Sequence, residues 1–167
     1  MRIKATVLVL VVILIAVIAF NYYNLMPKGI VTASVVEKSE GILLRYERIR
    51  YPSMAIVSGS GTDVGFDIGD EHLNFGLIPV GGGGKRFLNI ENQESRTINI
   101  KLNAYGNISE FVSFNMNNFI LQPGENVEVE VSFDTDDMTE EGEYSGEIDV
   151  TKTVSKNIVG DLFLGWF

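Results

Sequence analysis

The chain has 167 residues, with 13 Lys and Arg against 22 Asp and Glu, which gives a formal net charge of −9. Such an acidic surface repels nucleic acid and anionic lipid headgroups, so the composition argues against a DNA- or RNA-binding role. The chain contains no cysteine, which excludes disulfides, thiolate zinc sites and cysteine catalysis. Its length allows one domain of ordinary size plus an appendage.

An apolar run occupies the N-terminus from Ala5 to Phe20, after the basic residues Arg2 and Lys4. At a rise of about 1.5 Å per residue the run covers about 24 Å, a little short of a usual membrane span. Its flanking charges and tyrosines predict that residues 1–24 form a signal anchor, a single transmembrane helix of a cell-membrane protein. The alternative is a cleavable signal peptide, and both interpretations place the following domain outside the cytoplasm.

Residues 25–57 are predicted to form a stalk and, within it, a candidate first strand. Pro27 and Gly29 interrupt any helix near its start. The segment from Ile42 to Met54 then mixes apolar and charged residues at both parities. This mixture suggests a strand whose basic side chains lie on the solvent face.

Short runs of alternating apolar and polar residues fill the chain from residue 58 to residue 167. The clearest run, from Val127 to Phe133, has valine or phenylalanine at every second position, as a strand with one buried face requires. Pro123-Gly124 supplies the preceding turn. Further runs of this kind lie at 88–91, 98–102, 112–116 and 144–150. The pattern predicts an all-β, immunoglobulin-like antiparallel β-sandwich of about seven to eight strands.

Four motifs recur in order between Leu73 and Val150. They are the segment LNFG, a glycine turn, an alternating strand that ends in Asn92, and QPGE before a late strand. Together they resemble the immunoglobulin-like superfamily of the major-sperm-protein and Hydin type. The resemblance covers about half of the chain and implies a binding and assembly module, of a kind also found in membrane-anchored prokaryotic, and especially archaeal, surface proteins.

The acidic loop from Asp134 to Glu141 is the best candidate for a site. Calcium takes six to eight oxygen ligands, and loops at the end of a sandwich gather carboxylates for it. The candidate ligands are Asp134, Asp136, Asp137 and Glu140. Their spacing is not that of an EF-hand, and a solvated loop that joins two strands is the alternative interpretation.

Three other features have simple structural interpretations. The glycine-rich, acidic segment 58–72 contains carboxylates that would suit calcium, but a flexible turn explains it. Gly81–Gly84 with Lys85 lacks the spacing of a phosphate-binding loop and is interpreted as a hairpin connection. His72 is the single histidine, so neither a catalytic triad nor a histidine metal site is predicted.

Two surface features complete the candidates. Asn107-Ile108-Ser109 is an N-x-Ser sequon, which predicts a glycosylation acceptor at Asn107. The tail from Asn157 to Phe167 is almost wholly apolar but too short to span a bilayer. It is interpreted as a last strand of the sandwich, a strand donated to a neighbouring subunit, or a contact with a membrane or a partner. Its candidate partner-binding residues are Phe163, Trp166 and Phe167.

The sequence therefore predicts a non-enzymatic, membrane-anchored extracytoplasmic module for protein recognition or assembly at a prokaryotic cell surface. The expected partners are surface proteins, or further copies of the chain bound through its tail, together with the membrane at the N-terminal helix. Nucleic acid is not expected, nor any cofactor apart from the calcium candidate. Two alternatives stay open: a subunit of an archaeal surface filament or archaellum-stator-like assembly, and a calcium- or carbohydrate-binding surface module.

Overall fold

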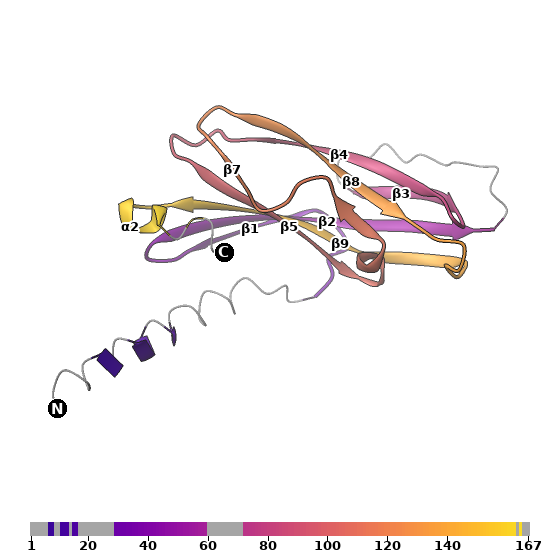
Figure 1. Cartoon of the computed structure of the whole chain (residues 1–167), viewed down its shortest axis with the longest axis horizontal. Coiled ribbons are helices and arrows are strands. Elements are labelled where there is room, and N and C mark those ends of the chain that lie inside the picture. The colour runs from indigo at the N-terminus through magenta and orange to yellow at the C-terminus, as the bar shows by residue number, and fades with distance from the viewer. Residues whose placement is uncertain are drawn as a thin grey trace.

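A computed structural model of the chain describes residues 7–8, 11–13, 15–16, 29–59, 72–162 and 164. Its strands form two stacked layers (Figure 1). Within these ranges the strands are β1 Val35–Glu40, β2 Leu44–Ser58, β3 Leu73–Pro79, β4 Gly83–Glu91, β5 Ile98–Gly106, β6 Val112–Phe114, β7 Phe119–Leu121, β8 Asn126–Asp134 and β9 Gly142–Ser155. Two short helical turns accompany them, η1 Asn107–Glu110 and α2 Ile158–Asp161.

The strands divide into two sheets. The larger one, sheet A, has the order β1-β2-β9-β5-β7, with β3 pairing parallel to β2. The smaller one, sheet B, has the order β4-β8-β6. All the other pairings are antiparallel. The described residues thus form an all-β sandwich compatible with an immunoglobulin-like domain, with nine strands where about seven to eight were predicted.

The strand with the clearest sequence pattern is β8. Val129, Val131 and Phe133 are fully buried, whereas Glu128 is exposed. This alternation follows from the pleat, which sends successive side chains to opposite faces of the sheet. In the turn before β8, Gly124 has φ 79°, a left-handed conformation that suits glycine. The predicted strand and its turn are both confirmed.

Two apolar clusters fill the space between the sheets. One surrounds Phe133, whose ring centroid lies 5.6 Å from that of Phe75 and 5.5 Å from that of Phe111. The other contains Ile100 of sheet A and Val129 of sheet B. Because each buried apolar side chain of this size contributes about 1.5–3 kcal/mol, these clusters hold the two sheets together.

β2 lies inside sheet A, where it pairs with β9 on one side and with β1 on the other. The sandwich therefore includes residues 44–57, which the sequence pattern had assigned to the segment 25–57. The expectation that the basic side chains of this strand lie on a solvent face is wrong, since Arg48 and Arg50 are 7% and 4% exposed. Both form ion pairs with acidic residues of β9, a distant strand that local alternation cannot reveal.

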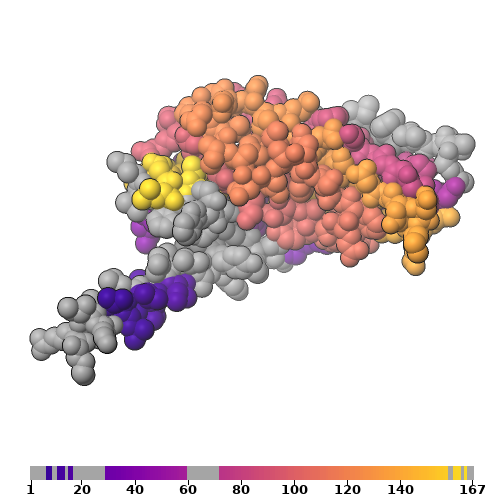
Figure 2. Space-filling model, in the orientation of Figure 1, coloured from indigo at the N-terminus to yellow at the C-terminus, as the bar shows by residue number. Residues whose placement is uncertain are grey.

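The predicted N-terminal transmembrane helix is corrected by the structure. Of residues 1–24, those described are helical, and their large apolar side chains are 45–65% exposed. In Figures 1 and 2 these residues (indigo) project from the sandwich. No helix formed by the described residues has the length and apolar character that a membrane crossing requires. The prediction rested on a run of about 24 Å, which falls short of the roughly 30 Å of a bilayer's hydrocarbon core.

The C-terminal tail leaves the sheet at Ser155 and, as far as it is described, does not add a strand. It forms α2, and the side chain of Leu164 is buried against Leu44 and Tyr46 of β2. The Ser155 hydroxyl donates a hydrogen bond to Asp161, which fixes this turn. Outside the described residues lie the candidate partner-binding residues Phe163, Trp166 and Phe167.

The glycine run at 81–84 carries the chain from one sheet to the other, since β3 belongs to sheet A and β4 to sheet B. Gly81 has φ 72°, and a Cβ at this position would lie 2.5 Å from Oδ1 of Asp137. The Gly81 amide donates a 3.2 Å hydrogen bond to the carbonyl of Asp136. The interpretation as a hairpin connection is wrong, because β3 and β4 belong to different sheets and do not pair with each other.

Candidate functional site

A cluster of buried charges lies on the outer face of sheet A, the face turned away from sheet B. It contains Arg48 and Arg50 of β2 with Glu147 and Asp149 of β9. In the register of the two strands Arg50 lies opposite Asp149 and Arg48 lies opposite Thr151. None of the four charged residues is more than 7% exposed. Removing such charges from water is costly unless they bond to one another.

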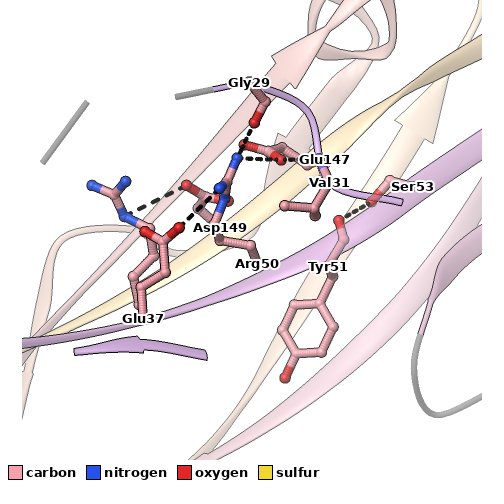
Figure 3. A network of polar contacts seen from close by, with 9 residues as sticks. Gly29, Val31, Glu37, Arg50, Tyr51, Ser53, Glu147 and Asp149 are labelled. Atoms are coloured by element: carbon pink, nitrogen blue, oxygen red, sulfur yellow. Dashed lines mark hydrogen bonds and ion pairs between the residues drawn. The ribbon is translucent and has the colours of Figure 1, made fainter. Parts of the chain in front are cut away.

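Arg50 is the centre of this cluster (Figure 3). It donates hydrogen bonds of 2.8 Å to both carboxylate oxygens of Glu147 and one of 3.0 Å to Glu37 of β1. It also donates to the carbonyl of Gly29, while Glu147 accepts a 2.9 Å bond from the amide of Val31. Burial would lower the pKa of Arg50, but its bonds to Glu147 and Glu37 outweigh this effect and raise it. The cluster thereby fastens the chain that precedes β1 to sheet A.

Asp149 is the least satisfied member of the cluster. Both of its carboxylate oxygens are buried and accept no hydrogen bond. The nearest cationic atoms are Nε of Arg48 at 3.6 Å and Nε of Arg50 at 3.8 Å. Burial, with a further contribution from the charge of Glu147, raises the pKa of Asp149 to about 6. Its charge therefore changes close to neutral pH.

Two more unpaired polar atoms lie in the same layer. Tyr46 Oη and Asn99 Oδ1 are buried without a hydrogen-bond partner, and both residues lie opposite Thr153. Burial raises the pKa of Tyr46 to about 12. In the described part of the chain no three carboxylate or imidazole side chains meet as a metal site. This layer is best explained as a polar seam that joins strands and the preceding chain.

Sheet B has two outer strands, β4 and the three-residue β6, and each pairs with β8 alone among the described strands. We call the side of the longer strand, β4, that faces away from β8 the open edge. At the two ends of this pairing, Thr135 N donates to Gly82 O and Asn92 N donates to Glu125 O, each at 2.8 Å. In an antiparallel ladder, residues bonded in this way alternate with residues whose main-chain groups point to the other side. The even-numbered residues of β4 therefore bond to β8. The main-chain groups that point away from β8 belong to Lys85, Phe87, Asn89 and Glu91.

A groove runs beside this edge, between β4 and the part of sheet A that sheet B does not cover. Its volume is about 310 Å³. The apolar side chains that line it are Ile49, Tyr51, Leu88, Ile90, Ile100 and Val150. Its polar lining includes Glu47, Glu91 and Lys152. The apolar floor continues onto β1, because Val36 lies directly opposite Ile49 and is 53% exposed.

The charges along β4 differ between its two ends. Lys85 donates a 2.7 Å hydrogen bond to Glu130 of β8, which raises the pKa of Lys85 and lowers that of Glu130. At the other end of the strand Glu91 lines the groove together with Glu47. Between the two ends, the ring of Phe87 is 55% exposed. Along β4 itself the edge thus runs from Lys85 through the exposed ring of Phe87 to Glu91.

The loop that was predicted to bind calcium is exposed, and its carboxylates are not gathered. Asp136 accepts a 2.8 Å hydrogen bond from the hydroxyl of Thr139, which lowers its pKa. Asp134 and Asp137 lie beside the glycine turn, and Glu140 is exposed. Across the described ranges no group of three or more His, Asp or Glu side chains is placed to hold a metal ion. Calcium binding by Asp134, Asp136, Asp137 and Glu140 stays a prediction.

The sequon residue Asn107 is exposed at the start of η1. Its Oδ1 accepts a 2.7 Å hydrogen bond from the amide of Ser145. A hollow of about 360 Å³ lies beside it, lined also by Phe111, Tyr144 and residues of the acidic loop. Attachment of a sugar to Nδ2 would leave the hydrogen bond at Oδ1 in place. Glycosylation of Asn107 stays a prediction.

Sequence reasoning placed its candidate sites in loops and in the tail, and it missed both the charge cluster and the open edge. One signal was available, because Arg48 and Arg50 share the parity of Leu44 and Tyr46, which indicates a buried face. The edge carried no such signal, since it depends on which strands pair. No protein-family model and no curated protein matches the chain.

Proposed function

We propose that the chain is a non-enzymatic module that recognises or assembles with a protein partner along the open edge of β4. One observation carries the proposal: the main-chain groups of Phe87 and Asn89 point away from β8, beside an apolar groove. The amide of Lys85 points the same way, while its carbonyl accepts a 3.2 Å hydrogen bond from the side chain of Arg86. An unpaired strand edge is a template for pairing with another chain, and many proteins shorten or cover such edges. Here the edge strand has nine residues, enough to pair with a full-length partner strand.

The free energy that an added strand would gain at this edge suits reversible binding of a protein partner. An added strand would gain main-chain hydrogen bonds worth about 0.5–1.5 kcal/mol each. It would also bury alternate side chains in the groove, each contributing about 1.5–3 kcal/mol when apolar. These gains must exceed the cost of ordering the partner and of association, so the binding should be specific but reversible.

We also propose that the sandwich is of the major-sperm-protein and Hydin type. In support, two of the motifs that resemble this superfamily meet in space, because Gly124 N donates a 2.9 Å hydrogen bond to the carbonyl of Asn92. The side-chain amide of Asn92 donates to the carbonyls of Arg96 and Leu121, at 2.9 and 3.0 Å. The resemblance implies binding and assembly, in agreement with the open edge.

A cell-surface location belongs to the same proposal. It rests on the basic residues Arg2 and Lys4 followed by the apolar run from Ala5 to Phe20, which is the pattern of a secretory signal sequence. Protease added to intact source cells should degrade the sandwich if the location is right. Full protection of the sandwich in intact cells, with degradation after lysis, would place it inside.

Site-specific photocrosslinking in the source cells tests recognition at this edge. A photoreactive residue at Asn89, which lines the groove, should give discrete adducts with a partner. The matched control is Met138, which is 90% exposed on the acidic loop. Adducts at Asn89 but not at Met138 support the proposal, whereas no adduct at Asn89, or the same adducts at both positions, would reject it.

A further inference from the structure

We infer that the occupant of the β4 edge is a single extended segment with apolar residues at alternate positions and a basic residue beside Glu91. This inference rests on the proposed function and adds the shape, the pattern and the polarity of the partner. Each of these three properties follows from a separate feature of the edge.

The shape follows from sheet A, which extends beneath the open edge. Ile49 and Tyr51 of β2 line the groove, and Val36 of β1 continues its floor. A strand added to β4 would lie about 4.8 Å from it, with sheet A about 10 Å below. A folded partner with a second sheet of its own would need the space that β1 and β2 fill. The same collision opposes the pairing of β4 with β4 of a second copy, so a single strand is the shape that fits.

The pattern follows from the pleat. Side chains of an added strand alternate between the groove and the solvent face, as those of β4 do. On the groove side they would meet Leu88 and Ile90 of β4 and Ile49 of β2. On the other side they would lie beside the exposed ring of Phe87. The partner therefore needs an apolar residue at every second position, with small polar residues between.

The polarity follows from the charges at the two ends of β4. Glu91 lies at one end of β4 and Lys85 at the other. Cross-strand pairs of opposite charge contribute about 0.2–1 kcal/mol each, and like charges directly opposite each other destabilise. A partner with a basic residue beside Glu91 and an acidic residue beside Lys85 is therefore favoured over the reverse arrangement.

A pair of synthetic peptides tests the pattern. The matching peptide, Lys-Val-Thr-Val-Thr-Val-Glu with capped ends, places valine over the groove when it runs antiparallel to β4. The control, Lys-Thr-Val-Thr-Val-Thr-Glu, keeps the charges, puts threonine at the three groove positions and places its two valines on the solvent face. In NMR titrations of the full chain the matching peptide should bind at least about tenfold more tightly. Equal binding of the two peptides would overturn the inferred pattern.

A pair of variants tests the strand pairing itself. Phe87→Pro removes an N–H that points away from β8, a position where proline is tolerated in an edge strand. Phe87→Val removes the same ring but keeps the N–H. The matching peptide should lose at least about tenfold affinity for the proline variant and about twofold or less for the valine variant. Equal affinity for the two variants would overturn strand addition.

Two further measurements separate a loss of peptide binding from unfolding of the proline variant, and strand addition from recognition in general. Circular dichroism melting shows whether Phe87→Pro stays folded, and Asn89→Pro with Asn89→Val provides a second pair if it does not. Crosslinking at Asn89 separates the two levels of the proposal. Adducts at Asn89 without peptide binding would keep recognition and reject the extended strand, whereas the loss of both would reject the proposed function as well.

Discussion

Replacing Asp149 by asparagine should remove a pH-dependent loss of stability. The carboxyl group is fully buried, and its pKa rises from an ordinary 3.8 to about 6 because of burial. The folded state therefore holds this proton more tightly than the unfolded chain does. The resulting stabilisation is fully present below pH 3.8 and is lost as the pH rises through 6. Asparagine resembles the protonated acid at every pH.

The size of the effect follows from the shift in pKa. A shift of about two units corresponds to about 3 kcal/mol over the whole titration. Because folding and protonation are linked, about 1.4 kcal/mol of this loss in the free energy of unfolding occurs between about pH 5 and about pH 8. Because other groups titrate too, the useful quantity is the free energy of unfolding of the wild type minus that of Asp149→Asn. This difference should fall by about 1–2 kcal/mol across the interval.

Urea denaturation at several pH values, followed by far-UV circular dichroism, measures this difference. The control is Thr151→Val, which changes a buried neighbour on the same face of β9 without changing a titrating group. Its difference from the wild type should stay flat with pH. A difference for Asp149→Asn that also stays flat, or that rises with pH, would refute the claim that this carboxylate is buried without adequate partners.

Three further substitutions test the packing that positions the edge, each by urea denaturation. Phe133→Ala should lower the free energy of unfolding by about 3–5 kcal/mol because it leaves a cavity in the aromatic cluster between the sheets. A loss below about 1 kcal/mol would show that this cluster is not the core. Asn92→Ala should lower the free energy of unfolding by about 1–3 kcal/mol, because the carbonyl of Leu121 loses its buried hydrogen-bond donor. An unchanged stability would show that Asn92 does not hold the end of β4 to β7. Gly146→Ala should lower the free energy of unfolding by about 1–3 kcal/mol or more, since a Cβ there would lie 1.9 Å from the carbonyl of Tyr105. An unchanged stability would contradict the close approach of β5 and β9.

The class of fold could be predicted from the sequence because the pleat is a local property. The alternation in β8 is written in consecutive residues, and the glycine at position 124 marks its turn. Neither the composition of the sheets nor their order is local. The glycine run at 81–84 looks the same whether it closes a hairpin or joins two sheets, so the sequence pointed to the wrong connection.

The charge cluster on sheet A and the open edge of β4 could not be predicted, because both depend on which strands pair. Arg50 looks like a solvent-facing residue until β9 brings Glu147 to it from 97 positions away. The N–H of Phe87 looks like any strand amide until the register with β8 shows that it points away. Charge pairing and edge status are both properties of strand neighbours, which a single sequence does not specify.

The central claim is that β4 accepts a strand along its free edge, and amide hydrogen exchange tests it most directly. Exchange is measured by NMR for each residue of β4, with and without the matching peptide. The account predicts that the peptide slows exchange at Lys85, Phe87 and Asn89, whose amides point outward, and leaves the amides bonded to β8 unchanged. Uniform protection along β4, or protection confined to another part of the sandwich, would contradict it.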